Sequence, residues 1–348
     1  MFSSKKEENT LTVGFYNVEN LFDTIDDPNT LDDDFTRNGK KRWGYKRYKI
    51  KIKKLGSVIS QLGVHRSKLP PAIVGLVEVE NAQVVLDLAN SSNLRRYHYG
   101  VVHYDSPDER GIDVALLYNK QVFELIDSET YPVYLEDEEG VRDYTRDILK
   151  VSGNLKGELV HVLVNHWSSR REGESVTAHK RITAAETVRS IITKIRDKEM
   201  NPKIIIMGDF NDDPTSKSVK EYLVQDDFFN PMQSLLAKGN GSLTYNGKWN
   251  LFDQIIFSKN FLEKKEGSLY FKHAEVFNQK WMKIFRGKLK GSPFRTYIGK
   301  WYQGGFSDHF PVYAFLKKKD QSFPIFLKAF FNFSSLRMYF LYLPSLYL

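Results

Sequence analysis

Residues 204–214 read IIIMGDFNDDP, and the interpretation of the whole chain starts from this stretch. Three isoleucines and a methionine form a continuous apolar run, which is typical of a strand covered on both faces. The run ends in Gly208 and then presents Asp209 and Asn211, which an extended chain places on one side. Gly, Asp, Asn and Pro are also common turn residues. We favour a functional interpretation, in which a buried strand delivers two polar side chains to its carboxyl end.

Predicted strands alternate with amphipathic segments along the rest of the chain. Runs rich in Val, Ile, Phe and Tyr predict strands at Leu11–Val18, Ala72–Val79, Tyr97–Tyr104, Ile112–Tyr118, Leu159–Asn165, Lys203–Gly208, Leu251–Phe257 and His309–Leu316. Apolar residues at helical spacing predict helices at Tyr45–Leu62, Ala82–Ala89, Val176–Lys198 and Lys217–Leu223. Val122–Tyr134 is expected to pair antiparallel with Ile148–Leu155. These patterns favour one mixed α/β domain without an internal repeat.

The composition excludes several classes of site. The chain has 348 residues, of which 41% are hydrophobic, and no cysteine. Disulfide frameworks, thiolate zinc sites and cysteine nucleophiles are therefore excluded. A chain of this length buries a large core and needs no structural metal to fold. The formal net charge of +8 favours polyanions or anionic surfaces as partners.

Two segments carry most of the local charge. Residues 40–54 read KKRWGYKRYKIKIKK, and aromatic residues among cations are typical of nucleic-acid-binding surfaces. The alternative, which we favour, is the solvated face of a helix that turns Ile50, Ile52 and Leu55 inward. Residues 23–34 read DTIDDPNTLDDD. This acidic segment lacks the spacing of a calcium-binding loop, so a solvated loop is expected.

The two ends of the chain differ from the predicted domain. Residues 1–10 lack the apolar core of a secretory signal, so we predict an N-terminal extension and a cytoplasmic location. Residues 318–348 are apolar, but polar residues interrupt them, and a membrane span needs about 20 unbroken apolar residues. Membrane contact, a surface helix and a tail foreign to the domain remain open for this tail. Residues 11–317 are predicted to form the domain, as a monomer with no obligate protein partner.

Polar residues follow several predicted strands at their carboxyl ends, where open α/β sheets bind ligands. Asn17 ends the first strand in FYNVENLF, and Glu78 and Glu80 follow the apolar run in IVGLVEVEN. Alternation is expected to place the two glutamates on the same side. Because a buried carboxylate is unfavourable without a cation or a donor, Glu78 is either a salt-bridge partner or a metal ligand.

Three further fragments carry groups suited to phosphate chemistry. In VNHWSSRR, His166 follows a strand and precedes Arg170, whose guanidinium matches two phosphate oxygens. In NLFDQIIFS, Asp253 lies inside an apolar run and needs a buried partner. In FSDHFPV, Asp308 and His309 stand next to each other. Adjacent side chains of a strand point to opposite faces, so different roles are expected for them.

These fragments, in this order, resemble the endonuclease/exonuclease/phosphatase superfamily. It contains deoxyribonuclease I, exonuclease III-type repair nucleases, sphingomyelinases and inositol-polyphosphate phosphatases. GDFN and SDH are the most specific motifs, and Asn17, Glu78 and Asp253 support them over a region from Thr12 to about Leu316. The resemblance implies a four-layer sandwich, in which two mixed β-sheets pack face to face and are flanked by helices.

The resemblance also implies roles for most of these residues. Glu78 is expected to be the main metal carboxylate, with Asn17 and Asp308 as further ligands. Asp209 would orient or deprotonate the attacking water, and Asn211 would position that water against phosphorus. His309 would stabilise the charge that develops on the phosphoryl group, and Asp253 would hold the histidine ring.

The resemblance implies that a second group of residues also acts on the substrate. His166 matches the histidine that deoxyribonuclease I-like members use as a general acid, and Asp105 or Asp108 would be its carboxylate partner. Arg110, in RGIDVALLY, and Arg170 would contact phosphate.

The implied reaction is hydrolysis of a phosphodiester by activated water. The expected cofactor is Mg²⁺, with Mn²⁺ or Ca²⁺ as alternatives, because Mg²⁺ takes few carboxylates and keeps several waters. The basic charge favours an endo- or exonuclease whose substrate is nucleic acid. A phosphomonoesterase or a lipid phosphodiesterase would use the same core, and a non-catalytic nucleic-acid-binding module is a third alternative.

Overall fold

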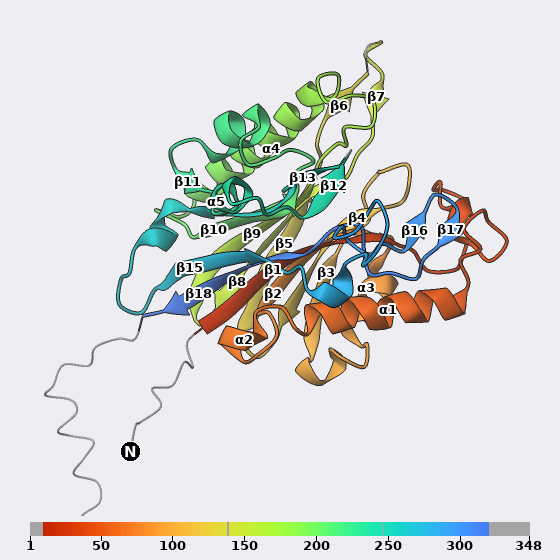
Figure 1. Ribbon diagram of the computed structural model, residues 1–348. Helices are drawn as coiled ribbons and strands as arrows, with labels where there is room; N and C mark the ends of the chain where they lie inside the picture. Colours follow the sequence, from red (N-terminus) through yellow and green to blue (C-terminus); the bar gives the residue numbers. More distant parts are fainter. Residues whose placement is uncertain (1–9, 138, 246, 320–348) are drawn as a thin grey trace, which may run out of the picture.

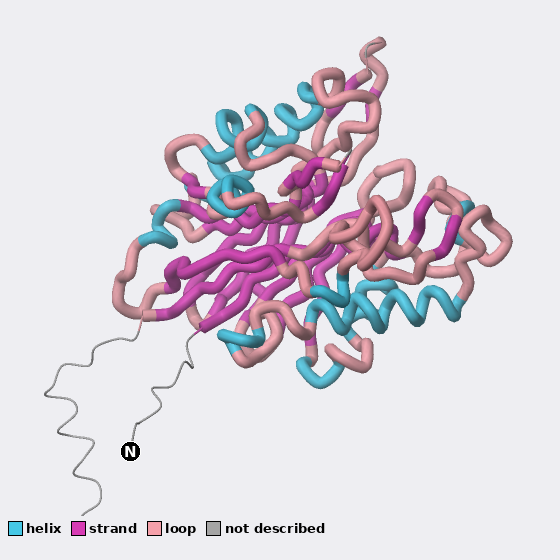
Figure 2. Tube along the Cα trace, in the orientation of Figure 1, coloured by secondary structure: helices cyan, strands magenta, loops and turns pink. Residues whose placement is uncertain are grey.

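The computed structural model describes residues 10–137, 139–245 and 247–319. Two six-stranded sheets pack face to face, and helices cover the outer face of each (Figures 1 and 2). This arrangement is the predicted four-layer sandwich. Residues 1–9 of the expected extension and residues 320–348 of the expected tail lie outside the described residues.

The first sheet has the strand order β15-β18-β1-β2-β4-β3. Its strands are β1 (Thr10–Leu21), β2 (Ile73–Val79), β3 (Tyr99–His103), β4 (Asp113–Asn119), β15 (Leu269–Val276) and β18 (Val312–Lys318). β1 and β2 run parallel, whereas the other neighbours are antiparallel. The carboxyl ends of β1 and β2 therefore lie at the same edge of the sheet.

The second sheet has the order β11-β14-β10-β9-β8-β5. Its strands are β5 (Phe123–Tyr131), β8 (Ile148–Leu155), β9 (Glu158–His166), β10 (Ile204–Asp209), β11 (Phe228–Phe229) and β14 (Asp253–Ser258). β5 pairs antiparallel with β8, as predicted. β9 and β10 run parallel, so their carboxyl ends also meet at one edge.

Helices and short hairpins complete the fold. The helices are α1 (Tyr45–Ile59), α2 (Val64–Ser67), α3 (Ala82–Ala89), α4 (Ala178–Arg196), α5 (Met232–Ala237) and a π-helical segment, η3 (Ser218–Val224). Short 3₁₀ turns span Asp33–Phe35, Arg95–Tyr97, Lys259–Leu262 and Lys280–Met282. The hairpins are β6–β7 (Leu135–Glu136, Arg142–Asp143), β12–β13 (Leu243–Tyr245, Lys248–Asn250) and β16–β17 (Tyr297–Ile298, Trp301–Tyr302). None of the helices in the described part of the chain has the length and apolar character to cross a bilayer.

Three apolar layers hold the sandwich together. Between the sheets, Phe15 and Val77 of the first pack in the same buried cluster as Val164 and Met207 of the second. The outer layers join α1 and α3 to the first sheet and α4 to the second. Burial of an apolar side chain of this size stabilises a fold by about 1.5–3 kcal/mol, so these layers fix how the two sheets face each other.

The structure corrects two details of the predicted elements. β18 begins at Val312 and not at His309, because Pro311 has no N–H to donate to a neighbouring strand. Asp308 and His309 therefore lie in the preceding loop, where strand alternation does not apply. In α1, Ile50 was expected to face inward, but its side chain is exposed, and the neighbouring Lys51 is buried instead.

Candidate active site

The polar residues predicted at strand ends meet where the carboxyl ends of β1 and β2 in the first sheet lie against those of β9 and β10 in the second. In the second sheet, Asp209 pairs with His166 of β9 on one side and with Asp253 of β14 on the other. In the first sheet, Asn17 pairs with Val77, one residue before Glu78. Since both sheets end at this place, segments far apart in the sequence contribute to one cluster.

Asn17 connects the two halves of the cluster. Its Nδ2 donates to Asp209 Oδ2 at 3.0 Å and to Glu78 Oε1 at 3.2 Å. Its Oδ1 accepts from the backbone N–H of Glu19 at 2.9 Å. The side chain is fully buried, so this amide holds one carboxylate from each sheet in a fixed relation.

Glu78 leaves the regular strand geometry at this point. Its φ is 63°, and the register between β1 and β2 and between β2 and β4 shifts here. Non-glycine residues rarely adopt such a φ, and they cluster at functional sites. The expected alternation of Glu78 and Glu80 is wrong, because the bulge separates them. Glu78 Oε2 accepts from the Asn20 N–H at 2.9 Å, and Glu80 Oε2 accepts from the Asp23 N–H at 2.5 Å.

Two imidazoles lie near the Asp209 carboxylate. Asp209 Oδ2 lies 4.0 Å from His166 Nε2 and 3.9 Å from His309 Nε2. Burial raises the pKa of Asp209 to about 6, while His309 opposes the shift and Asp253 adds to it. Burial also lowers the pKa of His166 well below its usual value, and Arg146 and other cations lower it further. The His166 ring is therefore neutral at pH 7.

His309 and Asp253 form a buried pair, as the resemblance implies. His309 Nδ1 lies 2.7 Å from Asp253 Oδ2, and both side chains are buried. Burial alone lowers the pKa of His309, but Asp253, Asp209 and Asp308 together raise it well above its usual value. The Nε2 atom then carries a proton and points toward Asp209, so it can donate to an anionic group placed between them.

Asp308 has a different partner from its neighbour. Arg295 Nη2 donates to Asp308 Oδ2 at 2.7 Å, and Arg295 Nε donates to Glu19 Oε1 at 3.3 Å. Burial lowers the pKa of Arg295, but Asp308, Glu19 and Glu78 raise it above its usual value. The negative charges of Asp308 and Glu78 thus both stabilise the Arg295 guanidinium. Asp308 Oδ1 is buried and has no hydrogen-bond partner among the described residues.

Arg110 and Arg170, the two predicted phosphate contacts, differ in the partners of their guanidinium groups. Arg110 is partly exposed and feels the charge of Glu78, which raises its pKa against the larger lowering effect of burial. Arg170 Nε donates to Asn211 O at 2.7 Å and to Asp212 Oδ1 at 3.0 Å, and its Nη1 lies 2.9 Å from Glu174. This geometry favours a role for Arg170 in bracing the Asn211 turn.

Asn211 is held close to Asp209. Its φ is 48°, its N–H donates to Asp209 Oδ1 at 3.0 Å, and its Nδ2 donates to Trp167 O at 3.0 Å. The strand-alternation argument does not apply to it, because β10 ends at Asp209. Asn211 still lies beside Asp209 and fixes the direction of that carboxylate.

The two candidate partners of His166 lie elsewhere. Asp105 is 3.8 Å from His103, and Asp108 pairs with Arg146 at 2.9 Å. Among the described residues, the carboxylates within 4.0 Å of His166 Nε2 belong to Glu78 and Asp209. His166 Nδ1 is buried and has no hydrogen-bond partner there.

This arrangement agrees with comparison to known families. Residues 12–318 match the endonuclease/exonuclease/phosphatase family. The chain belongs to this family. The family consists of hydrolases that act on phosphoester bonds, and its fold is typically dependent on a divalent metal. No curated protein matched the chain.

Solved structures of the endonuclease/exonuclease/phosphatase family share the fold. Truncated TDP2 from Caenorhabditis elegans is 15% identical with a TM-score of 0.53, covering 88% of this chain and 97% of that one. D. rerio TDP2 with a single-strand DNA product has 15% identity and a TM-score of 0.52, covering 89% and 99%. The Bacteroides thetaiotaomicron mannosyl-6-phosphatase Bt3783 is 18% identical with a TM-score of 0.53, and the match covers 88% of this chain and 99% of that one. At such identities the likeness shows the fold alone.

The residues of the cluster fit a divalent metal of this family. Glu78 accepts two N–H groups and keeps further lone pairs, since a carboxylate has about four acceptor sites. Asp308 Oδ1 is a buried anionic oxygen without a partner among the described residues, and a cation would offset its charge. One donor atom each from Asp209, Asp253 and His309 also lie within 4.8 Å of one another. Oxygen donors in this number suit Mg²⁺.

Sequence reasoning missed the cations that support the cluster. Lys51 Nζ lies 3.7 Å from Glu19 Oε2 and donates to Phe306 O at 2.7 Å. Its position was readable, since Tyr48, Lys51 and Leu55 fall on one face of a helix. Arg295 had no signal, because it follows an irregular segment with no strand to place it.

Proposed function

We propose that this protein is a Mg²⁺-dependent phosphodiesterase that hydrolyses nucleic acid, as an endo- or exonuclease. One observation supports the reaction most directly. Asp209 Oδ2 lies about 4 Å from the Nε2 atoms of both His166 and His309. These separations are too long for hydrogen bonds but suit a bridging oxygen from water or phosphate. A carboxylate base and two imidazoles about 4 Å from it are the groups that activated-water attack requires.

The roles follow from the contacts. Asp209 accepts the proton of the attacking water, while Asn17 and Asn211 hold its two oxygens in place. His309 donates through Nε2 to a non-bridging phosphoryl oxygen, with Asp253 fixing the ring at Nδ1. Such donors act where charge develops in the transition state.

The remaining assignments concern substrate and metal. His166 Nε2 lies 4.0 Å from the same Asp209 oxygen, and His166 is proposed to contact the leaving-group oxygen. Arg110 is proposed to contact a phosphate. Glu78, Asp308 and Asn17 would hold the Mg²⁺. When bound, this ion would offset phosphate charge and polarise the phosphoryl group.

A basic segment beside the site favours nucleic acid as the substrate. Residues 280–301, here termed the basic lip, contain seven Lys and Arg residues and no Asp or Glu. Phe285 and Trp301 of the lip are 77% and 68% exposed. Arg286 and Lys288 line a groove in it together with Arg295. Arg295 also donates to Asp308, so this groove leads to the catalytic cluster.

Cations that track a backbone and aromatic rings on which bases stack are the elements of single-strand recognition. A small phosphomonoester would use neither element beyond the first phosphate. The structural relatives include D. rerio TDP2 with a single-strand DNA product and a mannosyl-6-phosphatase. The relatives therefore leave both chemistries open, and the basic lip is what favours the nuclease.

Substrate comparison tests the proposal. Single-stranded DNA, duplex DNA, RNA, an aryl phosphodiester and an aryl phosphomonoester should be compared with Mg²⁺. We expect the polymers to have the highest kcat/KM and Asp209→Asn to abolish turnover of every substrate. Faster turnover of the phosphomonoester than of any polymer would favour the phosphatase alternative.

A matched pair of variants tests the basic lip. Phe285→Ala should raise KM for single-stranded DNA roughly tenfold, because stacking of one base is worth about 1–3 kcal/mol. It should leave turnover of the aryl phosphodiester unchanged. Tyr134→Ala is the control, since Tyr134 is similarly exposed at 63% but precedes β6. Equal KM values for the two variants would contradict nucleic-acid binding by the lip.

A further inference from the structure

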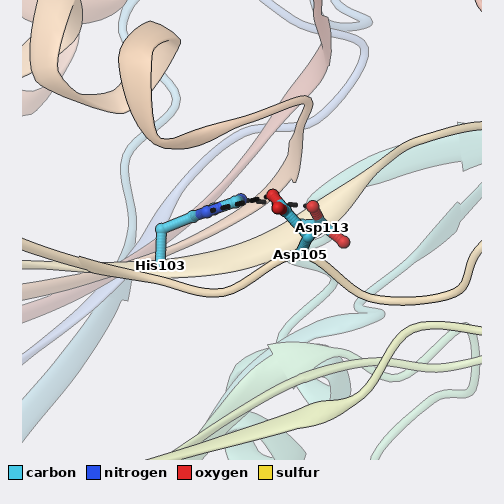
Figure 3. Close-up of side chains that lie close together, drawn as sticks. All are labelled: His103, Asp105 and Asp113. Carbon is cyan, nitrogen blue, oxygen red and sulfur yellow. Dashed lines mark ion pairs between the residues drawn. The ribbon is translucent and has the colours of Figure 1, made fainter. Parts of the chain in front are cut away.

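A second cluster of metal-ligating groups lies outside the catalytic residues. His103 ends β3, Asp113 begins β4, and Asp105 lies in the loop that joins these strands. Figure 3 shows the His103 imidazole pointing toward the carboxylates of both aspartates. One donor atom from each of the three residues lies within 4.8 Å of the other two.

The histidine of this cluster has a buried nitrogen that no hydrogen bond satisfies. The His103 side chain is 2% exposed, and its Nε2 has no hydrogen-bond partner among the described residues. Asp113 Oδ2 lies 3.2 Å from this nitrogen. Leaving a buried nitrogen unsatisfied costs about 1–3 kcal/mol, so both atoms are arranged for a third partner.

Hydrogen bonds hold only one of the two oxygens of the Asp113 carboxylate, which lies opposite His103. Asp113 Oδ1 accepts from the backbone N–H of Ser106 at 2.9 Å and also from the Ser106 hydroxyl. Oδ2 faces His103. Burial raises the pKa of the Asp113 carboxyl, even though His103 and Ser106 lower it. Metal-binding carboxylates are commonly held in this way by a second hydrogen bond.

The separation of the two donors matches a tetrahedral ion. Zinc binds imidazole nitrogen at about 2.0–2.1 Å and carboxylate oxygen at about 2.0–2.2 Å. With a tetrahedral angle between them, two such ligands stand roughly 3.3 Å apart. The distance between His103 Nε2 and Asp113 Oδ2 is 3.2 Å. Asp105 Oδ1 lies 3.8 Å from the other ring nitrogen, His103 Nδ1, and its side chain is 89% exposed, so the carboxylate would have to turn toward Nε2 to reach an ion at this point.

We propose that His103, Asp105 and Asp113 form a zinc site distinct from the catalytic cluster. Imidazole together with carboxylate suits Zn²⁺, whereas Mg²⁺ prefers an all-oxygen set. Three protein ligands leave the fourth position for water. The site requires no cysteine, which the chain lacks.

The position of the site gives the ion a structural role. The loop between β3 and β4 carries Asp108 and Arg110. Asp108 binds Arg146 at 2.9 Å, and Arg146 Nη2 donates to Trp167 O at 2.8 Å. An ion that ties Asp105 to both strands closes this loop at its base. The ion thereby steadies Arg110, which borders the catalytic cluster.

Zinc titration of the full chain tests the site independently of catalysis. Wild type, His103→Gln, Asp113→Asn and His309→Gln are titrated with Zn²⁺ by calorimetry in a large excess of Mg²⁺. We expect His103→Gln and Asp113→Asn to lose one equivalent of Zn²⁺ and His309→Gln to keep it. With Co²⁺ as the probe, the visible absorption of a tetrahedral ion should be present in His309→Gln and absent in His103→Gln.

An exposed position guards against misfolding of the buried variants. Asp105→Asn should weaken Zn²⁺ binding at least about tenfold without changing the melting temperature of the metal-free protein. Asp26→Asn, which also changes an exposed aspartate, is the control and should bind as wild type does. Wild-type stoichiometry and affinity in both His103→Gln and Asp105→Asn would overturn the proposal. Such a result would leave His103 and Asp113 as a buried charge pair.

Discussion

Replacement of Gly208 by alanine tests why a glycine precedes Asp209. A Cβ at Gly208 would lie 2.5 Å from the backbone oxygen of Asn165 and 2.8 Å from its Cβ. Ordinary contact begins at 3.4 Å, so one of the paired strands, β9 or β10, must move by roughly 1 Å, at a cost of about 1–3 kcal/mol. The backbone atoms cannot rotate away as a flexible side chain can.

The displacement falls on the catalytic groups. Asp209 follows Gly208 directly and pairs with His166 across the same two strands. A misplacement of about 1 Å can cost roughly 10²-fold in rate. We therefore expect Gly208→Ala to lower kcat for an aryl phosphodiester by roughly 10²-fold and to lower the melting temperature.

A second glycine supplies the control. In β1, the nearest atom to a Cβ at Gly14 would be the end of the flexible Leu62 side chain, at 3.2 Å. Gly14→Ala should therefore keep near-wild-type kcat and stability, as measured by steady-state kinetics and thermal unfolding. Wild-type kcat together with a wild-type melting temperature in Gly208→Ala would show that the close approach of β9 and β10 does not position Asp209.

Three further predictions address charge and metal. Asp253→Asn should lower kcat by about 10²–10⁴-fold, since it removes the charge that holds the His309 proton; the melting temperature, measured alongside, should change far less than activity. EDTA should abolish turnover, and Mg²⁺ or Mn²⁺ should restore it in a coupled phosphate-ester assay. Burial raises the pKa of Glu80 from 4.5 to about 8, so the folded state keeps a proton that the unfolded chain releases. The free energy of unfolding should therefore fall as pH rises from 4.5 to about 8, and Glu80→Gln should remove much of that fall in urea titrations.

Each of these predictions has a result that contradicts it. Near-wild-type kcat in Asp253→Asn would show that the His309 ring needs no carboxylate. Turnover that resists prolonged chelation would exclude a dissociable metal. An unchanged slope of stability against pH in Glu80→Gln would assign that pH dependence to other groups.

The fold was largely predictable because its strands are apolar over their whole length. Runs such as Ile204–Met207 bury every residue, since both faces of each sheet are covered. Their carboxyl ends then locate the polar residues without knowledge of the tertiary structure. For this reason Asn17 and Asp209 could be expected in one cluster, whereas Asp253 reaches it from the amino end of the antiparallel strand β14.

Local geometry at the strand ends could not be predicted in the same way. Alternation assumes a regular strand, and Glu78 lies in a bulge with a left-handed backbone. In the loop before β18, Asp308 pairs with Arg295 and His309 pairs with Asp253. Both partners are distant in sequence or lie outside regular strands, so local patterns could not predict these pairs. Arg295 reaches Asp308 from an irregular segment, and neither its spacing nor its neighbours carry a periodic signal.

The basic stretch at residues 40–54 raises the net charge of the chain, but two of its cations bind groups of the protein itself. Lys41 Nζ donates to Gly299 O at 2.7 Å, and Lys51 donates to Phe306 O and to Thr296 Oγ1. These cations are satisfied by the carbonyl and hydroxyl groups of residues 296–306. Their contribution to net charge therefore says little about a binding surface.

The same contacts nevertheless serve the site indirectly. They hold the chain that presents Arg295 to Asp308 and that carries Trp301 of the basic lip at the surface. Phosphate contacts by side chains that already bind carbonyl groups would require breaking those bonds, whereas Lys288, Lys290 and Lys300 are exposed. Removal of charge from the lip should therefore weaken nucleic-acid binding, and removal of charge from α1 should first loosen the lip itself.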